Sequence, residues 1–204
     1  MDIVVLHNAA TYLVCHKPAG VEAEHQLPRL VCEQENLPCL YPVHRLDKET
    51  AGVILLAKTK PAAAFFSQAV AQNKLEKTYL AVVKGTPPEP AGTFTDLLFR
   101  DTQKNKSYPV KRMRKGVKEA RLSYQTVEGL TLNGVPHTLV KIALQTGRTH
   151  QIRVQFASRQ MPLLGDKKYG GCPHPTLGLL AYRLTFPTPQ GEWVTVTAPQ
   201  TSPL

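Results

Sequence analysis

One carboxylate, Asp47, lies inside a short cationic segment that leads directly into an apolar run. The segment is His44-Arg45-Leu46-Asp47-Lys48-Glu49-Thr50-Ala51-Gly52, and Val53-Ile54-Leu55-Leu56-Ala57 follows it. A short apolar run of this composition predicts a strand that is buried on both faces. An acid on the turn before such a strand could be a catalytic carboxylate, or it could be a solvated side chain that pairs with Arg45 or Lys48.

Motifs for several other chemistries are absent from the chain. It contains no glycine-rich phosphate loop ending in Lys-Ser or Lys-Thr, no His-Glu-x-x-His and no Gly-x-Ser-x-Gly. A retaining glycosidase would need a second carboxylate close to Asp47, and the adjacent Glu49 faces elsewhere if the turn feeds an extended strand. The four cysteines lack the close spacing of a zinc site. We therefore expect Asp47 to act without a partner acid, a metal or a cofactor.

The charge balance indicates a polyanionic partner. Twenty-five Lys and Arg residues against fifteen Asp and Glu residues give a formal net charge of +10. A basic excess of this size favours nucleic acid, because each cation that neutralises a phosphate releases condensed counterions. The densest basic segment is Lys104–Lys118, which contains no acid. Its alternative interpretation is a mobile, solvated loop.

The length of 204 residues is sufficient for one substantial core, so we expect a single domain over residues 1–204. No apolar run is long enough to span a bilayer, and no contact with a membrane is expected. The N-terminus begins Met1-Asp2 and lacks the basic region and cleavage site of a secretory signal. We expect a cytoplasmic protein that is a monomer.

Strands dominate the predicted secondary structure. Apolar and β-branched patterns predict strands at residues 3–6, 12–15, 53–57, 78–83, 120–127, 138–145, 179–186 and 193–197. Asn133-Gly134 predicts the turn of one hairpin, whereas residues 91–118 are expected to form loops or a long hairpin.

Two helices are expected among these strands. The first follows Pro61, where apolar residues recur at helical spacing. The second is short, carries Ile152 and Phe156 on one side, and could be capped by Thr149. Few helices and many strands that are neighbours in sequence predict an α+β fold with one large, mixed, mostly antiparallel sheet.

Several segments of the chain match known motifs in the right order. The first is His44-Arg45-Leu46-Asp47-x-x-Thr50-x-Gly52 with the apolar run and Ala57-Lys58 after it. Two others are Lys77-Thr78-Tyr79-Leu80-Ala81 and the stretch Leu144–Val154, which reads LQTGRTHQIRV. The segments Lys17-Pro18-Ala19-Gly20 and Gly165-Asp166-Lys167-Lys168-Tyr169-Gly170 extend the match. Over nearly its whole length, the chain therefore resembles the RluA-type pseudouridine synthases.

The resemblance implies the pseudouridine synthase fold and an isomerase that converts selected uridines of ribosomal or transfer RNA to pseudouridine. Such an enzyme detaches the base at N1, turns it and rejoins it to the ribose through C5, without a cofactor. An RNA-binding protein of the same fold that does not depend on catalysis is the alternative. The chain has no room before Lys17 for the S4-like domain of many relatives, so we expect a stand-alone catalytic domain that recognises RNA with its own loops.

Roles for four residues follow from the resemblance. Asp47 is the catalytic carboxylate, and Arg153 is its salt-bridge partner, which would favour the ionised acid. Tyr79 stacks on the target base, and Arg45 occupies the space that the flipped base leaves. The alternatives are a surface or phosphate-binding arginine for Arg153, a core tyrosine for Tyr79 and a phosphate contact for Arg45.

The chain departs from the family pattern at two places. Ala51 replaces the usual Ser, and Gln155-Phe156 replaces the more familiar His-Leu. Neither change touches a residue with a predicted role in the reaction. We expect the second change to alter the packing or a local contact of the short helix.

Overall fold

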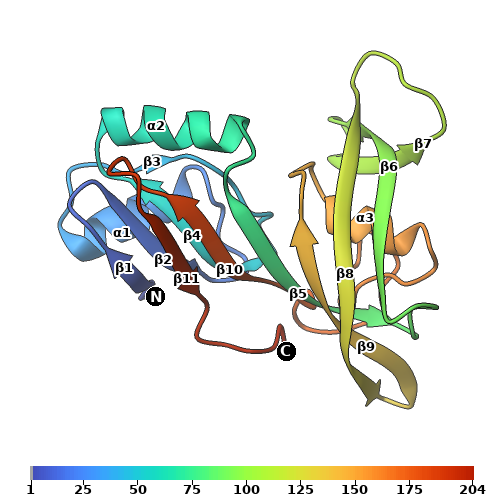
Figure 1. The fold of residues 1–204 in the computed structure, drawn as a ribbon. Helices are drawn as coiled ribbons and strands as arrows, with labels where there is room; N and C mark the ends of the chain where they lie inside the picture. Colours follow the sequence, from blue (N-terminus) through green and yellow to red (C-terminus); the bar gives the residue numbers. More distant parts are fainter. Residues whose placement is uncertain (1) are drawn as a thin grey trace. The chain divides into compact units, whose positions relative to one another are not determined.

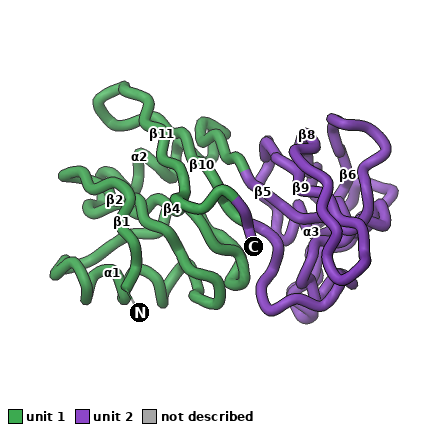
Figure 2. Tube along the Cα trace, turned by 90° about the horizontal axis from the view of Figure 1, so that it is seen from below, with its two compact units in different colours: residues 1–78, 180–201 green, residues 79–179, 202–204 purple. Residues whose placement is uncertain are grey.

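The structure, a computed structural model, describes residues 2–204, which form eleven strands and three helices. They belong to two compact units (Figure 2). The first unit contains the chain up to Thr78 and Leu180–Thr201, and the second contains Tyr79–Leu179 and Ser202–Leu204. Residues 79–179 of the second unit are thus inserted into the sequence of the first. The single domain over residues 1–204 stays a prediction.

The first unit is built on strands that pair mainly antiparallel (Figure 1). Strand β2 (Tyr12–Lys17) pairs antiparallel with β1 (Val4–Asn8) and with β4 (Ala51–Ala57). Strand β10 (Leu179–Pro187) runs parallel to β4 and forms the predicted closing hairpin with β11 (Trp193–Thr197). The two-residue strand β3 (Tyr41–Pro42) also pairs with β4. Residues 52–57 of β4 are all buried, which confirms the strand with two covered faces.

Helix α2 (Lys60–Ala71) begins and packs as its sequence predicts. The Thr59 hydroxyl accepts a hydrogen bond from the Ala62 N–H at 3.3 Å, and Pro61 occupies the first turn, where no amide hydrogen is needed. The helix crosses one face of the strands in the first unit (Figure 1). Phe66 is fully buried there, with edge contacts to the rings of Tyr12 and Phe186.

Helix α1 (Gln26–Glu35) is absent from the sequence prediction, which treated this stretch as irregular. Only Leu27, Pro28 and Val31 are buried, so its apolar stripe is too short to stand out in the pattern. Its N-terminus is held by the Glu22 carboxylate, which accepts hydrogen bonds from three successive amides, those of residues 24–26, at 2.7–3.2 Å. The helix therefore depends on a side chain outside it.

The second unit contains five strands in the order β5-β9-β8-β6-β7. Their bounds are β5 Glu76–Lys84, whose first three residues belong to the first unit, β6 Ala91–Asp101, β7 Lys106–Val110, β8 Val117–Leu132 and β9 Val135–Leu144. Both residues of the Asn133-Gly134 turn have positive φ, 50° and 74°, which confirms the predicted hairpin. The stretch from 91 to 118 is a β6–β7 hairpin followed by a loop into β8.

Helix α3 (Gln151–Ala157) packs its Phe156 ring against Phe94 and Tyr124, with ring centroids 5.1 and 5.8 Å apart. The predicted cap by Thr149 is wrong, because the N-cap residue is His150, which has φ 53° and makes no side-chain cap bond. Instead, the Gln151 side-chain carbonyl oxygen accepts the Arg148 N–H at 3.0 Å. The chain enters the helix in a left-handed conformation, which turns Thr149 out of the cap position.

The α+β class and the mixed, mostly antiparallel strand pairing are confirmed, and β4 and β10 run parallel. Among the described residues, no helix is both long and apolar enough to cross a membrane.

Candidate active site

The Asp47 turn lies in the first unit, immediately before β4. The Thr50 N–H donates to the Asp47 carbonyl oxygen at 3.0 Å and closes the turn. The Gly20 N–H donates to the Lys48 carbonyl oxygen at 2.8 Å, so the loop after β2 holds the turn from the other side. The side chain of Asp47 is half-buried. The acid is thus carried by a backbone that is braced on both sides.

Gly52 shows why this turn must lead into β4 through a glycine. Its φ is +126°, and a Cβ atom built there would lie 2.2 Å from the Ala181 carbonyl oxygen. Any side chain would therefore displace β4 from its parallel partner β10, where Gly52 is paired with Ala181. The glycine of the motif sets the path of the chain from Asp47 into the sheet.

His44 anchors the start of the turn to the buried strand. Its Nε2 atom accepts the Leu55 N–H at 3.0 Å, so the ring is the neutral tautomer that carries its proton on Nδ1. Burial, with a smaller contribution from the positive charge of Lys77, holds the pKa of His44 well below its usual value. The first residue of the motif is therefore an uncharged hydrogen-bond acceptor.

Arg45 is exposed on this anchored turn. Its side chain is 52% exposed and forms an ion pair with Glu24 at 3.1 Å. A pair this exposed contributes about 0–1 kcal/mol and is readily exchanged for another anion or for a stacking partner. Arg45 is therefore available to a ligand at little cost in stability.

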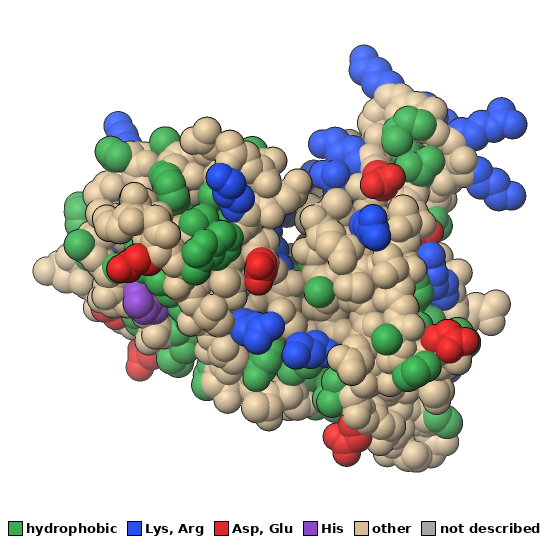
Figure 3. All heavy atoms as spheres, in the orientation of Figure 1, with side chains coloured by type: hydrophobic (Ala, Val, Ile, Leu, Met, Phe, Trp, Pro, Cys, Tyr) green, Lys and Arg blue, Asp and Glu red, His purple; other side chains and the backbone are tan. Residues whose placement is uncertain are grey.

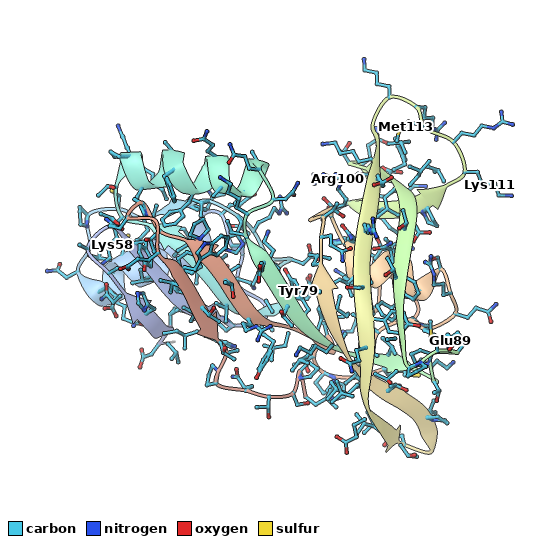
Figure 4. All side chains as sticks on the ribbon, viewed as in Figure 1. Lys58, Tyr79, Glu89, Arg100, Lys111 and Met113 are labelled. Atoms are coloured by element: carbon cyan, nitrogen blue, oxygen red, sulfur yellow. The ribbon has the colours of Figure 1, made fainter. Side chains whose placement is uncertain are left out.

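Tyr79 and Arg153 lie in the second unit, and both are buried. Tyr79 is 7% exposed on β5 and is labelled in Figure 4, and Arg153 is 4% exposed on α3. Arg153 forms a two-pronged ion pair with Asp166: Nε donates to Oδ2 at 2.7 Å and Nη2 donates to Oδ1 at 2.8 Å. Because Asp166 is 1% exposed, this pair fixes the plane of the guanidinium group.

The loop after α3 completes the surroundings of Arg153. Asp166 Oδ1 also accepts the backbone amides of Lys168 and Tyr169, at 3.0 and 3.1 Å. The Tyr169 ring lies 5.4 Å from the Arg153 guanidinium carbon, and its hydroxyl group accepts the Ser107 N–H at 2.9 Å. The Gly165–Gly170 motif therefore supplies both the acid and the aromatic ring that hold Arg153.

Asp166 and Tyr169 are functional candidates for which the sequence analysis predicted no role, although their motif was recognised. The available signal was the acid inside the Gly165–Gly170 motif, but thirteen positions separate Asp166 from Arg153, and no local pattern pairs them. The four residues with predicted roles divide between the units, with Arg45 and Asp47 in the first and Tyr79 and Arg153 in the second. The ion pair between Arg153 and Asp47 stays a prediction.

The departure at Gln155-Phe156 has a local packing role. Gln155 is fully buried, and its Nε2 atom donates to Asp96 Oδ2 at 2.8 Å and to the Ala120 carbonyl oxygen at 3.3 Å. Phe156 belongs to the aromatic cluster under α3. Both residues tie α3 to β6 and β8, and the expected difference in packing from the family pattern stays a prediction.

Basic side chains gather at the β7 end of the second unit. Residues 111–116, which join β7 to β8, are all exposed. In Figure 4 the labelled Lys111 lies on this loop and points outward, and blue Lys and Arg side chains project from the same end in Figure 3. Beside the hairpin, a cavity of about 190 Å³ is lined by Arg100, Lys118 and Arg148 among other residues. The surface suits a ligand with several negative charges.

The fold and these features define an α+β protein that carries an acid on a braced turn, a buried arginine and an exposed basic loop, as expected for a protein that acts on a polyanion. The chain belongs to the RNA pseudouridylate synthase family, whose sequence model matches residues 11–158. The resemblance to the RluA-type enzymes is thereby confirmed.

Individual relatives agree with the family assignment. An RNA pseudouridine synthase of Haemophilus influenzae is 32% identical over 176 residues, which are 83% of this chain and 75% of the relative. Ribosomal large subunit pseudouridine synthase D of Neisseria meningitidis is 33% identical over 97% of this chain and 56% of its own length. The chain spans about half the length of several curated relatives that it matches.

Solved structures show the same fold. The human protein RNA Pseudouridylate Synthase Domain Containing 1 superimposes with a TM-score of 0.86 at 24% sequence identity, over 98% of this chain and 84% of that protein. The predicted pseudouridine synthase fold is confirmed.

Proposed function

We propose that this chain isomerises selected uridines to pseudouridine in structured RNA, either ribosomal or transfer RNA. The observation that carries the proposal is Asp47 on its braced turn, inside a family motif and with the other family motifs in order. Ribosomal RNA is the first substrate to test, because the Neisseria relative is named for the large ribosomal subunit. The cytoplasmic location and the monomeric state are part of the same proposal.

In this reaction the N1–C1′ bond of the target uridine breaks, the base turns, and a C5–C1′ bond forms. A proton leaves C5 and N1 gains one, so the product is an isomer and no oxidant, reductant or activated co-substrate is consumed. Asp47 provides the carboxylate, either as a nucleophile or as an aid to a glycal intermediate. Arg153, which Asp166 orients, takes the role of salt-bridge partner of Asp47 that the family resemblance implies.

The target base must leave its stack before Asp47 can reach the sugar. Arg45 is exposed, and its exposed ion pair with Glu24 is weak. The Arg45 side chain can therefore leave Glu24 and occupy the space that the flipped base vacates. Tyr79 is the ring on which the turned base stacks. These two roles divide substrate binding between an exposed cation and a buried aromatic ring.

The RNA backbone is bound by the exposed loop at residues 111–116 and the adjacent basic cavity. The double variant Lys111→Gln/Lys115→Gln removes two charges from this loop, and Lys84→Gln/Lys141→Gln removes two exposed charges elsewhere in the same unit. We expect only the first variant to weaken RNA binding, with a fall of about 1–2 in the slope of log Kd against log salt concentration. Equal slopes for the two variants would contradict this assignment.

The activity is tested by mapping pseudouridine in total RNA from cells that lack the protein. Wild type, Asp47→Asn and Glu49→Gln are then returned to these cells, the last as a control that removes the neighbouring acid of the same turn. We expect the missing sites to return with wild type and Glu49→Gln but not with Asp47→Asn. If every site is independent of Asp47 while RNA binding persists, the chain is an RNA-binding protein of this fold rather than an enzyme.

A further inference from the structure

A groove in the first unit lies apart from the residues that have a role in the proposed reaction. It has a volume of about 440 Å³ and lies between the second half of helix α2 and the turn that joins β10 to β11. All of its lining residues belong to the first unit. The volume falls within the range of about 300–1,000 Å³ that is typical of sites for small ligands.

The single tryptophan of the chain lines this groove. Trp193 is the first residue of β11, lies opposite Pro187 of β10 and is 57% exposed. Tryptophan is highly buried on average, so an exposed ring in a groove is unusual. Such a ring offers a surface on which a nucleobase of any sequence can stack.

A buried hydroxyl group in the groove has no hydrogen-bond partner. Thr188 is 4% exposed and lines the groove, and its Oγ1 atom is unpaired among the described residues. The Thr188 backbone, by contrast, is bonded across the turn. Its N–H donates to the Glu192 carbonyl oxygen at 2.7 Å, and its carbonyl oxygen accepts the Gly191 N–H at 2.9 Å. Because an unpaired buried hydroxyl group is costly, a ligand that bonds to it would remove this cost.

A cation lies at the α2 side of the groove. Lys74 is exposed and is one of the lining residues. Helix α2 ends in a Schellman motif, in which Asn73 has φ 53°, the Asn73 N–H donates to Val70 O at 3.0 Å and the Lys74 N–H donates to Ala69 O at 2.9 Å. These bonds fix the backbone of Lys74 beside the groove. The acid of the β10–β11 turn, Glu192, is exposed and does not line the groove.

The surroundings of the groove favour a nucleotide over a protein partner. Of the large hydrophobic side chains that are exposed among the described residues, only Trp193 lines the groove. A stable protein interface buries about 1,200–2,000 Å² of surface, which one exposed ring does not supply. A stacking ring, an unpaired hydroxyl group and a lysine match the base, its polar edge and the phosphate of one nucleotide. The net charge of +10 favours a polyanion as the source of that nucleotide.

We propose that this groove binds one unpaired nucleotide of an RNA. The base stacks on Trp193, a polar atom of the base bonds to the Thr188 hydroxyl group, and the phosphate lies beside Lys74. The lining residues lie outside all the family motifs of the chain, so the groove is assigned to a nucleotide other than the target uridine. The proposal rests on the proposed function, since it takes the occupant from the RNA substrate.

The test follows the fluorescence of Trp193 while the full chain is titrated with a short single-stranded oligoadenylate. Because the chain has one tryptophan, the signal reports on the groove and not on the basic loop at residues 111–116. We expect saturable quenching, with a Kd at least about 10-fold lower than that for adenosine monophosphate. An oligomer of the same length without bases should not quench, because it cannot stack.

Two pairs of variants locate the contacts, and all four keep Trp193 as the reporter. Lys74→Gln should lower the slope of log Kd against log salt concentration by about 0.7, whereas Lys60→Gln, which removes an exposed charge at the other end of α2, should leave it unchanged. Thr188→Val should raise Kd about 3- to 10-fold, and Thr188→Ser should restore it. Urea denaturation should give Thr188→Val the stability of wild type, because its hydroxyl group has no bond to lose.

The remaining outcomes separate this proposal from the proposed function. Unchanged Trp193 fluorescence while labelled RNA binds to saturation would overturn the proposal and leave the role of Asp47 intact. Equal Kd values for adenosine monophosphate and the oligomer would overturn it in favour of a free nucleotide, and quenching by a proline-rich peptide but not by RNA would overturn it in favour of a protein. If quenching persists but pseudouridine formation is independent of Asp47, the groove stands and the proposed function fails.

Discussion

The two units hold their candidate catalytic groups by different means. In the first unit, the Asp47 turn is fixed through its backbone, by the carbonyl groups of Asp47 and Lys48 and by the close approach of Gly52 to Ala181. In the second unit, Arg153 is fixed through its side chain, by the carboxylate of Asp166 and the ring of Tyr169. A backbone support leaves the acid half-exposed for a substrate, whereas a side-chain support buries the arginine.

The difference bears on what each unit tolerates. Burying a side-chain ion pair costs free energy, because both charges lose their contact with water. Deleting one partner is also destabilising, because the other charge stays buried without compensation. A braced turn tolerates exchange of its exposed side chains but not a change of backbone path. Substitutions in the two units should therefore fail in different ways.

The largest loss of stability is expected from Asp166→Ala. This variant removes both acceptors of the two-pronged pair and leaves the buried Arg153 guanidinium without them, at a cost of about 3–5 kcal/mol. The control is Glu33→Ala, since the Arg29–Glu33 pair is 65–72% exposed and should cost less than about 0.5 kcal/mol. Urea denaturation measures both variants, and equal losses would show that burial does not distinguish the two pairs.

Gly52→Ala tests the backbone support of the first unit. The new Cβ atom would lie 2.2 Å from the Ala181 carbonyl oxygen at a φ of +126°, so we expect a loss of about 3 kcal/mol or more. Gly191 has φ +88° with nothing within 4 Å of a built Cβ, and Gly191→Ala should cost only about 1 kcal/mol. Both glycines have a positive φ, and only Gly52 lies against another strand, so the difference in melting temperature between the two variants measures the effect of the close approach. Similar melting temperatures would contradict the role of Gly52.

Acid should weaken the first unit through His44. The folded pKa of His44 lies well below its unfolded value, so only the unfolded chain takes up a proton as the pH falls below about 6.5. The contribution of His44 to the free energy of unfolding is fully present above about pH 6.5. We expect the free energy of unfolding to fall by about 2 kcal/mol between that pH and about pH 5.

His44→Gln keeps a side-chain carbonyl oxygen that can accept the Leu55 amide at every pH. Its stability should therefore fall less steeply than that of wild type over the same range, as followed by urea denaturation at several pH values. His16 also has a pKa that burial lowers, and it adds the same slope to both proteins. Parallel curves would show that His44 is protonated without loss of the fold.

The smallest effect is expected from Glu24→Ala. Both partners of the Glu24–Arg45 pair are about half exposed, so stability should change by less than about 0.5 kcal/mol. RNA affinity should rise by up to about threefold, because Arg45 is released from a competing carboxylate. A filter-binding titration at low salt measures this change, and a weaker affinity would count against an RNA contact of Arg45.

Local patterns predicted much of the fold. Pro61 at the start of α2, the Asn133-Gly134 turn and the apolar run of β4 each contain their signal within a few residues. Helix α1 was missed because its N-terminus depends on Glu22 and its buried stripe has only three members. The cap of α3 was misassigned because a left-handed His150 cannot be recognised from residue type alone.

The sequence alone determined the family and the candidates for the chemistry, because Asp47, Arg45, Tyr79 and Arg153 belong to short motifs whose order identifies the family. The tertiary structure decided how those residues are held. Lys17 meets the Asp47 turn across thirty-one positions, and Asp166 meets Arg153 across thirteen. Such contacts depend on strand register and burial, which place distant polar atoms within hydrogen-bond distance and which no local spacing of residue types encodes.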